Sequence, residues 1–296
     1  MRVIKLESNR TAEFIKYCKK YADEHDPSFL SDEDLREFEL DENNPTYILI
    51  DKKDKIVGAG SLMLPQSYRE NRRGRFRILH TEHPSLEAYE LLLEPFMRYT
   101  EEIDNIYLFI PENKKSIGDI CENLGFRIQR YSWVMKKLSD KADNPIFPKG
   151  YQLKPFRFGQ DEQIWCDILN ICFSHLAGHL DSTPDRIAEF ENSEYYLEDG
   201  MMMLYDNNKA VGIVRVSLED EEPQKDSYLD HLAVLPEYQG KGLGRNLLRA
   251  GVQLSKKHGL KYTWLTVNAE NNKAAELYTN EGFDKEEVII CYNKKL

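Results

Sequence analysis

Glycine alternates with other residues in one short stretch of the chain, and this spacing suits the binding of an anion. The stretch reads Gln239-Gly240-Lys241-Gly242-Leu243-Gly244-Arg245 and lies between a hydrophobic run and an amphipathic one. Glycine adopts positive φ readily and lets main-chain N–H groups approach a ligand, and a helix that follows adds its dipole. We therefore expect a pyrophosphate here, with positive charge added by Lys241 and Arg245. Glycines that serve only packing or a turn are the alternative.

The spacing of these glycines differs from that of two common nucleotide-binding loops. The chain has no G-x-x-x-x-G-K-[ST] segment, and the glycines at 240, 242 and 244 do not follow G-x-G-x-x-G. Neither an ATP site of that kind nor a dinucleotide site is favoured.

The segment instead resembles the acetyl-CoA loop of the GNAT N-acetyltransferase superfamily. The pattern of that loop, [QR]-x-x-G-x-[GA], is matched by Gln239 to Gly244, and the preceding Leu-Ala-Val-x-Pro-Glu-Tyr run is typical of the family. Asn271, Tyr278 and Gly282-Phe283 follow at the family's spacing, so the resemblance covers about residues 151–296.

This resemblance implies acetyl-CoA as the acyl donor and no metal. It implies that main-chain groups of Leu232, Ala233 and Val234 bind the pantetheine arm, that Gln239 to Arg245 bind the pyrophosphate, and that Asn271 contacts the cofactor. The family fold is a mixed central sheet whose fourth and fifth strands diverge, which exposes main-chain groups to an extended ligand.

Acyl transfer from a thioester to an amine needs a neutral nucleophile, stabilisation of the tetrahedral oxygen, and a proton for the departing thiolate. By the resemblance, Tyr278 stands where the family places its general acid, and an ordinary tyrosine pKa of about 10 keeps it protonated at neutral pH. A core tyrosine on an amphipathic helix is the alternative. The main-chain N–H of Val234 is the expected donor to the oxyanion.

The general base is expected on the fourth strand. Tyr228, Asp230 and Leu232 share one face by the two-residue period, so Asp230 is placed to reach an amine directly or through water, and His231 points to the opposite face. Many relatives carry a glutamate where this chain has Tyr228. Asp230 is therefore the candidate base, with a surface or substrate-orienting role left open.

Two histidines and an acidic run complete the candidate residues of the second half. His175 and His179 stand four residues apart, but no convincing third ligand accompanies them, so no metal site is expected. By the resemblance they border the acceptor cleft, which leaves a substrate contact open. Glu219 to Glu222 are interpreted as a solvated loop, with attraction of a cationic acceptor as the alternative.

Interleaved strands and helices position these residues and predict an α/β fold. In the second half we expect strands over 151–156, 201–205, 227–235 and 262–267, and helices over 161–173, 243–258 and 271–280. Thr183-Pro184 opens a further short helix, and Gly259 is placed to end the long one. The resemblance implies two tandem GNAT folds, each a mixed, mostly antiparallel central sheet flanked by helices, with the fourth and fifth strands splayed.

The first half repeats the second in a weakened form. Ile110 to Phe126 parallels Val267 to Phe283, and the hairpin turn at Asp51 to Lys55 parallels the one at Asp206 to Asn208. The expected ranges are a degenerate GNAT-like domain at 1–138, a polar linker at 139–149, and an active GNAT domain at 150–296.

The first half lacks the residues of the site. Where a glycine loop should stand, the chain reads His80 to Tyr89, with no glycine and with Glu82 facing any incoming phosphate, and Ile120 or Cys121 takes the place of Tyr278. A basic run is interpreted as an exposed hairpin tip, with binding of an anionic group as the alternative; it comprises Arg69, Arg72, Arg73, Arg75 and Arg77. The whole arrangement resembles the tandem GNAT proteins, among them mycothiol synthase, but too loosely for that enzyme's aminosugar acceptor to be carried over.

Composition limits the partners and the compartment. A chain of 296 residues with 41% apolar residues can bury two ordinary cores, and a formal charge of −11 opposes broad binding to nucleic acid. No run of roughly 18 apolar residues indicates a membrane span, and five scattered cysteines suit a reducing compartment. We expect a cytoplasmic monomer or homodimer with neither nucleic acid nor membrane as partner.

These residues together predict an acyltransferase that moves an acetyl group from acetyl-CoA to the primary amine of a small molecule by direct attack. A non-catalytic acyl-CoA sensor or a partner-binding module is the alternative. The acceptor is left open among polyamines, aminosugars, amino acids, antibiotics and protein N-termini.

Overall fold

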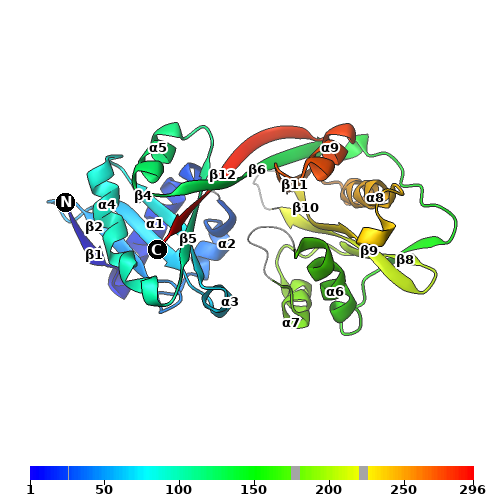
Figure 1. The fold of residues 1–296 in the computed structure, drawn as a ribbon, viewed down its shortest axis with the longest axis horizontal. Helices are drawn as coiled ribbons and strands as arrows, with labels where there is room; N and C mark the ends of the chain where they lie inside the picture. The colour runs from blue at the N-terminus through cyan, green and yellow to red at the C-terminus, as the bar shows by residue number, and fades with distance from the viewer. Residues whose placement is uncertain (26, 175–180, 220–225) are drawn as a thin grey trace. The chain divides into compact units, whose positions relative to one another are not determined.

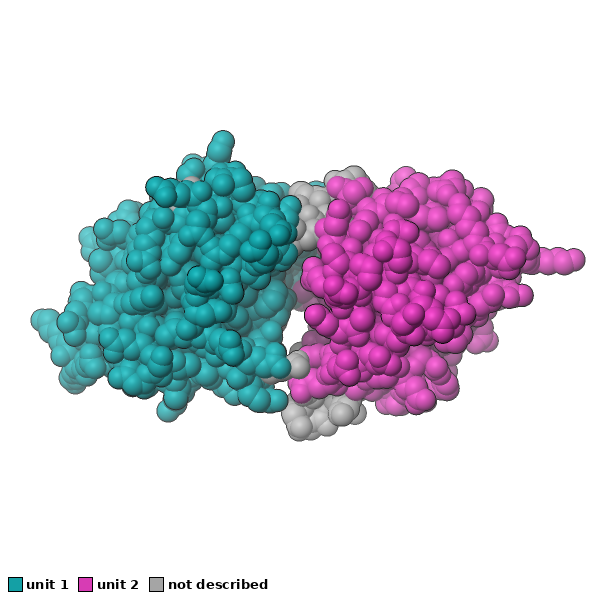
Figure 2. Space-filling model, turned by 90° about the horizontal axis from the view of Figure 1, so that it is seen from below, with its two compact units in different colours: residues 1–133, 268–270, 287–296 teal, residues 134–267, 271–286 magenta. Residues whose placement is uncertain are grey.

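The computed structural model describes residues 1–25, 27–174, 181–219 and 226–296. Contacts within the chain divide it into two compact units, coloured teal and magenta in Figure 2. Unit 1 comprises residues 1–133, 268–270 and 287–296, and unit 2 comprises residues 134–267 and 271–286.

Unit 1 is a mixed sheet with helices packed on it (Figure 1). Its strand order is β1-β2-β3-β4-β5-β12-β6; β1 to β4 are antiparallel neighbours, β4 runs parallel to β5, and β5 is antiparallel to β12. Its principal elements are β1 (Arg2–Lys5), α1 (Thr11–Lys20), α2 (Asp32–Arg36), β2 (Thr46–Ile50), β3 (Ile56–Met63), α3 (Gln66–Glu70), β4 (Arg73–Thr81), α4 (Leu86–Leu93), η4 (Glu94–Glu101), β5 (Asn105–Pro111), α5 (Lys115–Asn123) and the start of β6 (Arg127–Leu138).

Unit 2 repeats this plan. Its strand order is β6-β11-β10-β9-β8-β7, in which β7 to β10 are antiparallel neighbours and β10 runs parallel to β11. Its principal elements are β7 (Tyr151–Pro155), α6 (Glu162–Phe173), α7 (Pro184–Ala188), η6 (Glu189–Asn192), β8 (Met201–Asp206), β9 (Lys209–Glu219), β10 (Asp226–Val234), η7 (Pro236–Tyr238), α8 (Leu243–Lys257), β11 (Tyr262–Asn268), α9 (Asn272–Asn280) and the start of β12 (Asp284–Lys295).

Helices cover both faces of the unit 2 sheet, with α6 and α7 on one side and α8 on the other (Figure 1). The apolar residues of α8 recur at helical spacing, and Leu243, Leu247 and Leu248 are buried. Gly251 lets this helix approach the sheet, because a Cβ there would lie 2.9 Å from Leu229 Cδ1. Gly259, at φ +73°, follows the end of the helix as predicted. These contacts fix where the N-terminus of α8 meets the end of β10.

The two central parallel strands of unit 2 separate soon after they meet. β10 pairs with β11 only at Ser227↔Thr263 and Tyr228↔Trp264, whereas it pairs with β9 as far as Val234↔Gly212. Ser227 anchors the junction, since its Oγ lies 2.7 Å from Ser255 Oγ and 3.1 Å from the carbonyl oxygen of Tyr262. The predicted fold class, with its splayed fourth and fifth strands, is confirmed.

The last strand of the chain belongs to the first unit. Residues 287–296 of β12 lie in unit 1, where Ile289↔Pro111 to Lys295↔Asn105 pair with β5. The contacts also group residues 134–149 with unit 2. The domain ranges expected from the sequence, 1–138 and 150–296 with a linker at 139–149, stay a prediction. Within the described ranges no helix has the length and apolar character needed to cross a membrane.

Candidate active site

The glycine loop joins the end of β10 to the start of α8 and contains two left-handed glycines. Gly240 and Gly242 both have φ +76°, a conformation that other residues adopt only with strain. We expected all three glycines to adopt positive φ. Gly244 does not, because it lies in the first turn of α8 and is not among the residues with positive φ.

Packing does not explain these glycines. A Cβ at Gly240 or Gly242 would meet no heavy atom within 4 Å, and one at Gly244 would meet only Val234 Cγ2 at 3.9 Å. Backbone conformation accounts for the first two residues, but neither conformation nor crowding requires glycine at 244. The loop therefore leaves open space against its main chain, and a purely packing role is excluded for it.

The N-terminus of α8 points main-chain donors at this space. Gly242 is its N-cap residue, and no side chain caps the helix; the turn closes with the N–H of Asn246 donating to the carbonyl of Gly242 at 3.2 Å. The N–H groups of Leu243, Gly244 and Arg245 precede that bond and have no partner within the helix. Three donors and the positive end of the helix dipole thus meet at one exposed turn.

The two predicted basic residues of the loop differ in their surroundings. Lys241 is exposed, with its Nζ 4.8 Å from the centroid of the Tyr238 ring. Arg245 is held by Glu281, whose Oε1 lies 3.1 Å from Arg245 Nε and whose side chain is only 4% exposed. Arg249 donates to the same carboxylate at 2.6 Å. Glu281 therefore offsets part of the charge of Arg245, and Lys241 keeps its own available to an anion.

The end of β10 presents main-chain groups to the side from which β11 has departed. The N–H of Leu235 donates to the carbonyl of Val211 at 2.9 Å, so this is a hydrogen-bonded pair of the β9·β10 ladder. Antiparallel pairs alternate, so Val234 and Leu232 are non-hydrogen-bonded positions whose N–H and C=O point away from β9. The carbonyl of Val234 accepts from Gln239 Nε2 at 2.9 Å, so the predicted loop residue Gln239 anchors the loop to the strand.

The remaining residues predicted to bind the acyl donor are Ala233 and Asn271. Ala233 packs its side chain into the core against α6. Asn271 is the N-cap of α9, and its Oδ1 accepts from the N–H of Ala274 at 3.3 Å, which leaves its side-chain NH₂ group for other contacts. Cys172 on α6 reaches the same strand end, with its Sγ 3.4 Å from the carbonyl oxygen of Val234.

Tyr278 lies on α9 and is 8% exposed. Burial, with a smaller contribution from Tyr228, raises the pKa of Tyr278 to about 12, so its hydroxyl keeps its proton at neutral pH. The electrostatic effect of Tyr228, a residue of β10, indicates that Tyr278 lies near this strand.

A β-bulge alters the expected orientation of Asp230 and His231. The register of β10 against β9 shifts between Leu229 and His231, so Asp230 is an extra residue opposite Arg215. Strict alternation across the two faces fails at a bulge. Both Asp230 and His231 consequently contact residues on the α6 face, whereas Leu232 pairs with Val214, which packs against α8. The prediction that His231 points away from the face of Asp230 was wrong.

Asp230 forms an ion pair with Arg215 that is almost removed from solvent. The side chains of Arg215 and Asp230 are 10% and 22% exposed, and Nη1 of Arg215 donates to Oδ2 of Asp230. The Arg215 guanidinium also lies over the ring of Phe190, with Cζ 3.7 Å from its centroid. Burial lowers the pKa of Arg215 to about 10, which leaves the guanidinium charged at neutral pH.

His231 borders this ion pair as a neutral ring. The Trp165 indole N–H donates to its Nδ1 at 3.3 Å, which places the proton of the neutral ring on Nε2. Burial, with smaller contributions from Arg215 and Arg186, lowers the pKa of His231 to about 3. His231 therefore adds no charge to the face that carries Asp230. The periodicity of β10 could not have shown the roles of Arg215 and Phe190, because both are distant in sequence.

Some predicted residues fall outside the described part of the chain. His175 and His179 lie there, and so do residues 220–222 of the acidic run, while Glu219 ends β9. Within the described ranges no group of three or more His, Cys, Asp or Glu side chains could hold a metal ion.

The corresponding turn of unit 1 is closed by side chains. Ser85 caps α4, its Oγ accepting from the N–H of Ala88 at 3.3 Å. Partial burial acts to raise the pKa of Glu82, but hydrogen bonds from Lys55, Tyr21 and Lys20 outweigh it and lower that pKa to about 2. A serine hydroxyl thus already takes one of the donors of this turn, and a charged carboxylate lies three residues before the cap in the chain.

The basic run of unit 1 is only partly an exposed tip. Arg73, Arg75 and Arg77 lie on β4, and Arg77 is 9% exposed and donates to the carbonyl of Phe29 at 2.7 Å. The guanidinium of Arg75 lies over the Phe109 ring, 4.1 Å from its centroid. The interpretation as a hairpin tip was therefore wrong for these three arginines, which are strand residues packed against aromatic rings.

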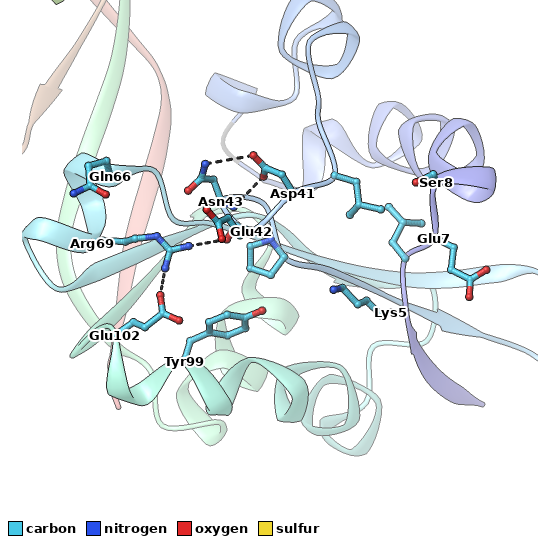
Figure 3. Close-up of a pocket in the computed structure, with 13 residues that line it drawn as sticks. Lys5, Glu7, Ser8, Asp41, Glu42, Asn43, Gln66, Arg69, Tyr99 and Glu102 are labelled. Atoms are coloured by element: carbon cyan, nitrogen blue, oxygen red, sulfur yellow. Dashed lines mark hydrogen bonds and ion pairs between the residues drawn. The ribbon is translucent and has the colours of Figure 1, made fainter.

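Unit 1 also contains a polar pocket of about 800 Å³, bordered by β1, the loop before β2, α3 and η4. Figure 3 shows the guanidinium of Arg69 pointing toward Glu102 and toward Glu42, whose carbonyl it contacts at 2.7 Å.

Comparison with known proteins agrees with the loop, the strand end and the fold. Residues 163–283 match the model of a family described as "Acetyltransferase (GNAT) family". This segment belongs to the GNAT family. The segment contains β10, the glycine loop, α8 and α9, so the resemblance predicted from the loop is confirmed.

Curated relatives of the chain are mycothiol acetyltransferases. The one from Pseudarthrobacter chlorophenolicus is 26% identical over 185 residues, which are 61% of this chain and 57% of the relative. The one from Catenulispora acidiphila is 26% identical over 172 residues, 57% of this chain and 55% of the relative. The chain thus spans less than two thirds of the length of these relatives.

Solved structures reproduce the fold over the whole chain. A GCN5-related N-acetyltransferase from Sphaerobacter thermophilus has a TM-score of 0.75 at 17% identity and covers 99% of this chain and 95% of its own. A tandem GNAT protein from the clavulanic acid biosynthesis pathway has a TM-score of 0.74 at 12% identity, over 99% of this chain and 98% of its own. At such identities these neighbours establish the tandem GNAT fold alone.

Proposed function

We propose that this chain transfers an acetyl group from acetyl-CoA to the primary amine of a small molecule, at the end of β10 in unit 2. The observation that carries the proposal is the uncapped N-terminus of α8, which adjoins open space and lies beside strand residues whose main chain faces an unpaired side. An acyl donor that is anionic and extended matches both features, and the family match indicates that this acyl donor is acetyl-CoA.

The donor would lie along the strand end and the loop. Its pyrophosphate would accept from main-chain N–H groups between Gly240 and Arg245, with Lys241 adding charge. Its pantetheine arm would pair with the main chain at Leu232 and Val234, whereas Ala233 pairs with β9 and contributes its side chain to the core. Asn271 would offer its side-chain NH₂ group. Glycine at 244 is then explained, because a side chain there would project into the space that the pyrophosphate needs.

The thioester would lie at the Leu232 end of this track. Val234 is nearer to the loop, and Leu232 is two residues farther along the strand, about 7 Å away. A donor whose pyrophosphate is fixed at the loop therefore brings its reactive end to Leu232 and leaves Val234 to the pantetheine arm. We assign stabilisation of the oxyanion to the N–H of Leu232 in place of the Val234 N–H expected from the sequence.

In the proposed reaction the amine nitrogen bonds to the thioester carbonyl carbon and the C–S bond breaks. The hydroxyl of Tyr278 gives its proton to the departing thiolate and recovers one from solvent. The amine nitrogen must lose a proton as well. Asp230, paired with Arg215, would accept a hydrogen bond from the amine and orient it, and the proton of the amine would pass to water.

The domain division is also a proposal. Residues 1–138 would form a degenerate GNAT-like domain and residues 150–296 the active one, joined by residues 139–149. The support is the turn at Ser85, where a side-chain cap and the Glu82 carboxylate occupy the place that the glycine loop takes in unit 2. Unit 1 is therefore not expected to bind the coenzyme.

A second candidate is a non-catalytic acyl-CoA sensor. The burial of Tyr278 favours it, because a phenol with a pKa of about 12 is a weaker acid than an ordinary tyrosine. A sensor would bind acetyl-CoA without releasing free thiol in the presence of any amine. Thiol release that requires both an amine and Tyr278 would exclude it.

Calorimetry with two matched glycine variants tests the donor site. Gly242 and Gly259 flank α8 at φ +76° and +73°, and a Cβ at either meets nothing within 4 Å. Gly242→Val and Gly259→Val should therefore strain the backbone equally. We expect Gly259→Val to bind acetyl-CoA like the unaltered protein and Gly242→Val to lose at least roughly a hundredfold in affinity, since several main-chain contacts depend on it. Equal affinities of the two variants would reject the proposed site.

A further inference from the structure

Arg215 has hydrogen-bonding capacity that the protein does not use. Its guanidinium carries five N–H donors, yet within the described ranges its hydrogen bonding is to Oδ2 of Asp230 alone. The ring of Phe190 covers one face of the group and holds it flat. The side chain keeps 10% of its surface exposed, and none of its nitrogens is among the buried polar atoms without a partner, so the unused donors can be reached by a second anion.

Asp230 has an unused hydrogen-bond acceptor. Its Oδ1 is buried and accepts no hydrogen bond from the described residues, although the side chain as a whole keeps 22% of its surface exposed. An ammonium group is the donor that a carboxylate oxygen in this position would favour. The pair thus offers free donors on one member and a free acceptor on the other, side by side.

We propose that the Arg215–Asp230 pair recognises an acceptor in which a carboxylate lies next to the amine, as in an α-amino acid. The N–H groups of Arg215 would bind the carboxylate in the two-bond geometry that guanidinium favours, and Oδ1 of Asp230 would accept from the ammonium, which gives one proton to water before the neutral amine attacks the thioester. The inference rests on the proposed acetyl transfer and names its substrate class.

The position of the pair agrees with this role. Asp230 precedes Leu232 by two residues on β10, at most about 7 Å along the strand since the bulge lies between them, so an amine held at Asp230 lies within reach of a thioester at Leu232. Neutral His231 adds no competing charge, and the exposed Arg186 adds a positive one nearby. A polyamine would bring a second cation toward Arg215 and leave the guanidinium donors without an acceptor.

Matched acceptor pairs test the proposal. Thiol release from acetyl-CoA is measured with lysine and cadaverine, with phenylalanine and phenethylamine, and with the two amino-acid amides. We expect kcat/KM for the better amino acid to exceed that of its decarboxylated amine and its amide by about tenfold to a hundredfold, the range for a charged hydrogen-bonded pair. Calorimetry of the same compounds with protein saturated with coenzyme A gives a readout independent of turnover.

Variants of Arg215 separate recognition from structural support. Arg215→Lys keeps the charge beside Asp230 but loses the planar fork, so KM for the amino acid should rise tenfold or more, and kcat/KM for the decarboxylated amine should fall by a much smaller factor. A purely structural role would lower both equally. The double variant R215M/D230L replaces the pair by apolar groups and guards against a misfolded single variant. Arg157→Lys, in the Arg157–Asp161 pair of the same unit, is the control and should change neither value.

The outcomes separate the two proposals. Equal use of amino acids and their decarboxylated amines, unaffected by Arg215→Lys, would overturn the inference and leave acetyl transfer standing. Binding of amino acids that depends on Arg215 without thiol release would overturn acetyl transfer and support the recognition. Loss of coenzyme binding in Gly242→Val with retained binding of amino acids would show that the two sites are independent and support both.

Discussion

Removal of one hydroxyl, by Tyr278→Phe, tests the proposed acid directly. Tyr278 is 8% exposed and its ring lies 6.0 Å from that of Phe283, so phenylalanine keeps the apolar contacts and the fold at neutral pH. Loss of a positioned general acid lowers the rate by about 10² to 10⁴, which corresponds to about 3–5 kcal/mol of transition-state stabilisation. We expect kcat to fall by this factor and the affinity for acetyl-CoA to stay the same.

The same substitution has a second effect at alkaline pH that follows from the raised pKa. Burial raises the pKa of Tyr278 to about 12, against about 10 in the unfolded chain, so the folded state prefers the neutral phenol. This preference is fully present below pH 10 and is lost as the pH rises to 12. Two pKa units correspond to about 3 kcal/mol. Because phenylalanine does not ionise, the variant should lose less stability than the unaltered protein over this window.

Two assays separate these effects. Thiol release with saturating amine measures kcat, with Tyr151→Phe on β7 as a control that should retain full activity. Urea denaturation at pH 8, 10 and 11.5 measures the free energy of unfolding of both proteins, and only their difference isolates Tyr278, since Tyr17, Tyr89 and Tyr292 also have raised pKa values. If kcat of Tyr278→Phe stays within threefold of the unaltered protein, Tyr278 is not the general acid. If the free energy of unfolding falls equally in both proteins between pH 8 and 11.5, the pKa of Tyr278 is not raised by burial.

Three further predictions concern unit 1. Glu82→Gln should lower the free energy of unfolding by about 1–2 kcal/mol, because solvent around the exposed Lys20 and Lys55 screens their attraction to the carboxylate. This contribution is present above pH 4.5 and is lost as the pH falls toward 2, because the folded pKa of Glu82 is depressed to about 2, so acid denaturation of the two proteins should converge below that pH. Ser85→Ala removes the cap of α4 and should lower the free energy of unfolding by about 0.5–2 kcal/mol, measured by urea denaturation. Ser67→Ala, within α3 and at no cap position, is the control and should not. Deletion of residues 287–296 removes the strand paired with β5 and should expose that edge, so light scattering should show aggregation of a protein that otherwise stays dispersed.

The glycine loop and its helix could be predicted from sequence because the signals are local. The positive φ of Gly240 and Gly242, the start of α8 at Leu243 and its end before Gly259 all follow from residues within a few positions of each other. Gly244 could be placed but not interpreted, because its lack of both strain and crowding is visible only when a Cβ is tested against its neighbours.

The orientation of Asp230 could not be predicted because it depends on another strand. The two-residue period of β10 is interrupted where two of its residues face Arg215 of β9, and the sequence of β10 alone gives no sign of this bulge. Arg215 itself attracts no notice in the sequence, since it is one basic residue in an otherwise apolar strand. Its importance comes from burial beside Asp230 and Phe190, which are 15 and 25 residues away in the chain.

The last strand shows a similar limit. The apolar pattern of residues 287–292 indicates a buried strand, but the same pattern would fit either of two sheets of the same fold. Only the pairing of Ile289 to Lys295 with β5 assigns it to unit 1. A duplicated fold therefore makes strand exchange hard to recognise from sequence, because each half contains a suitable neighbour for every strand.

Splayed strands alone do not make a binding site in this protein. β4 and β5 of unit 1 pair in parallel at three positions, Arg73↔Asn105 to Arg75↔Tyr107, and β10 and β11 of unit 2 pair at two, so both units open their sheet in the same way. The units differ at the turn that follows. In unit 1 the Ser85 hydroxyl takes a donor of α4 and the charged Glu82 lies in the same connection between β4 and α4, whereas in unit 2 the donors of α8 have no side-chain cap. Unsatisfied donors at a helix end favour a ligand that supplies the missing acceptors, so the proposed coenzyme site belongs to the turn that the chain leaves uncapped.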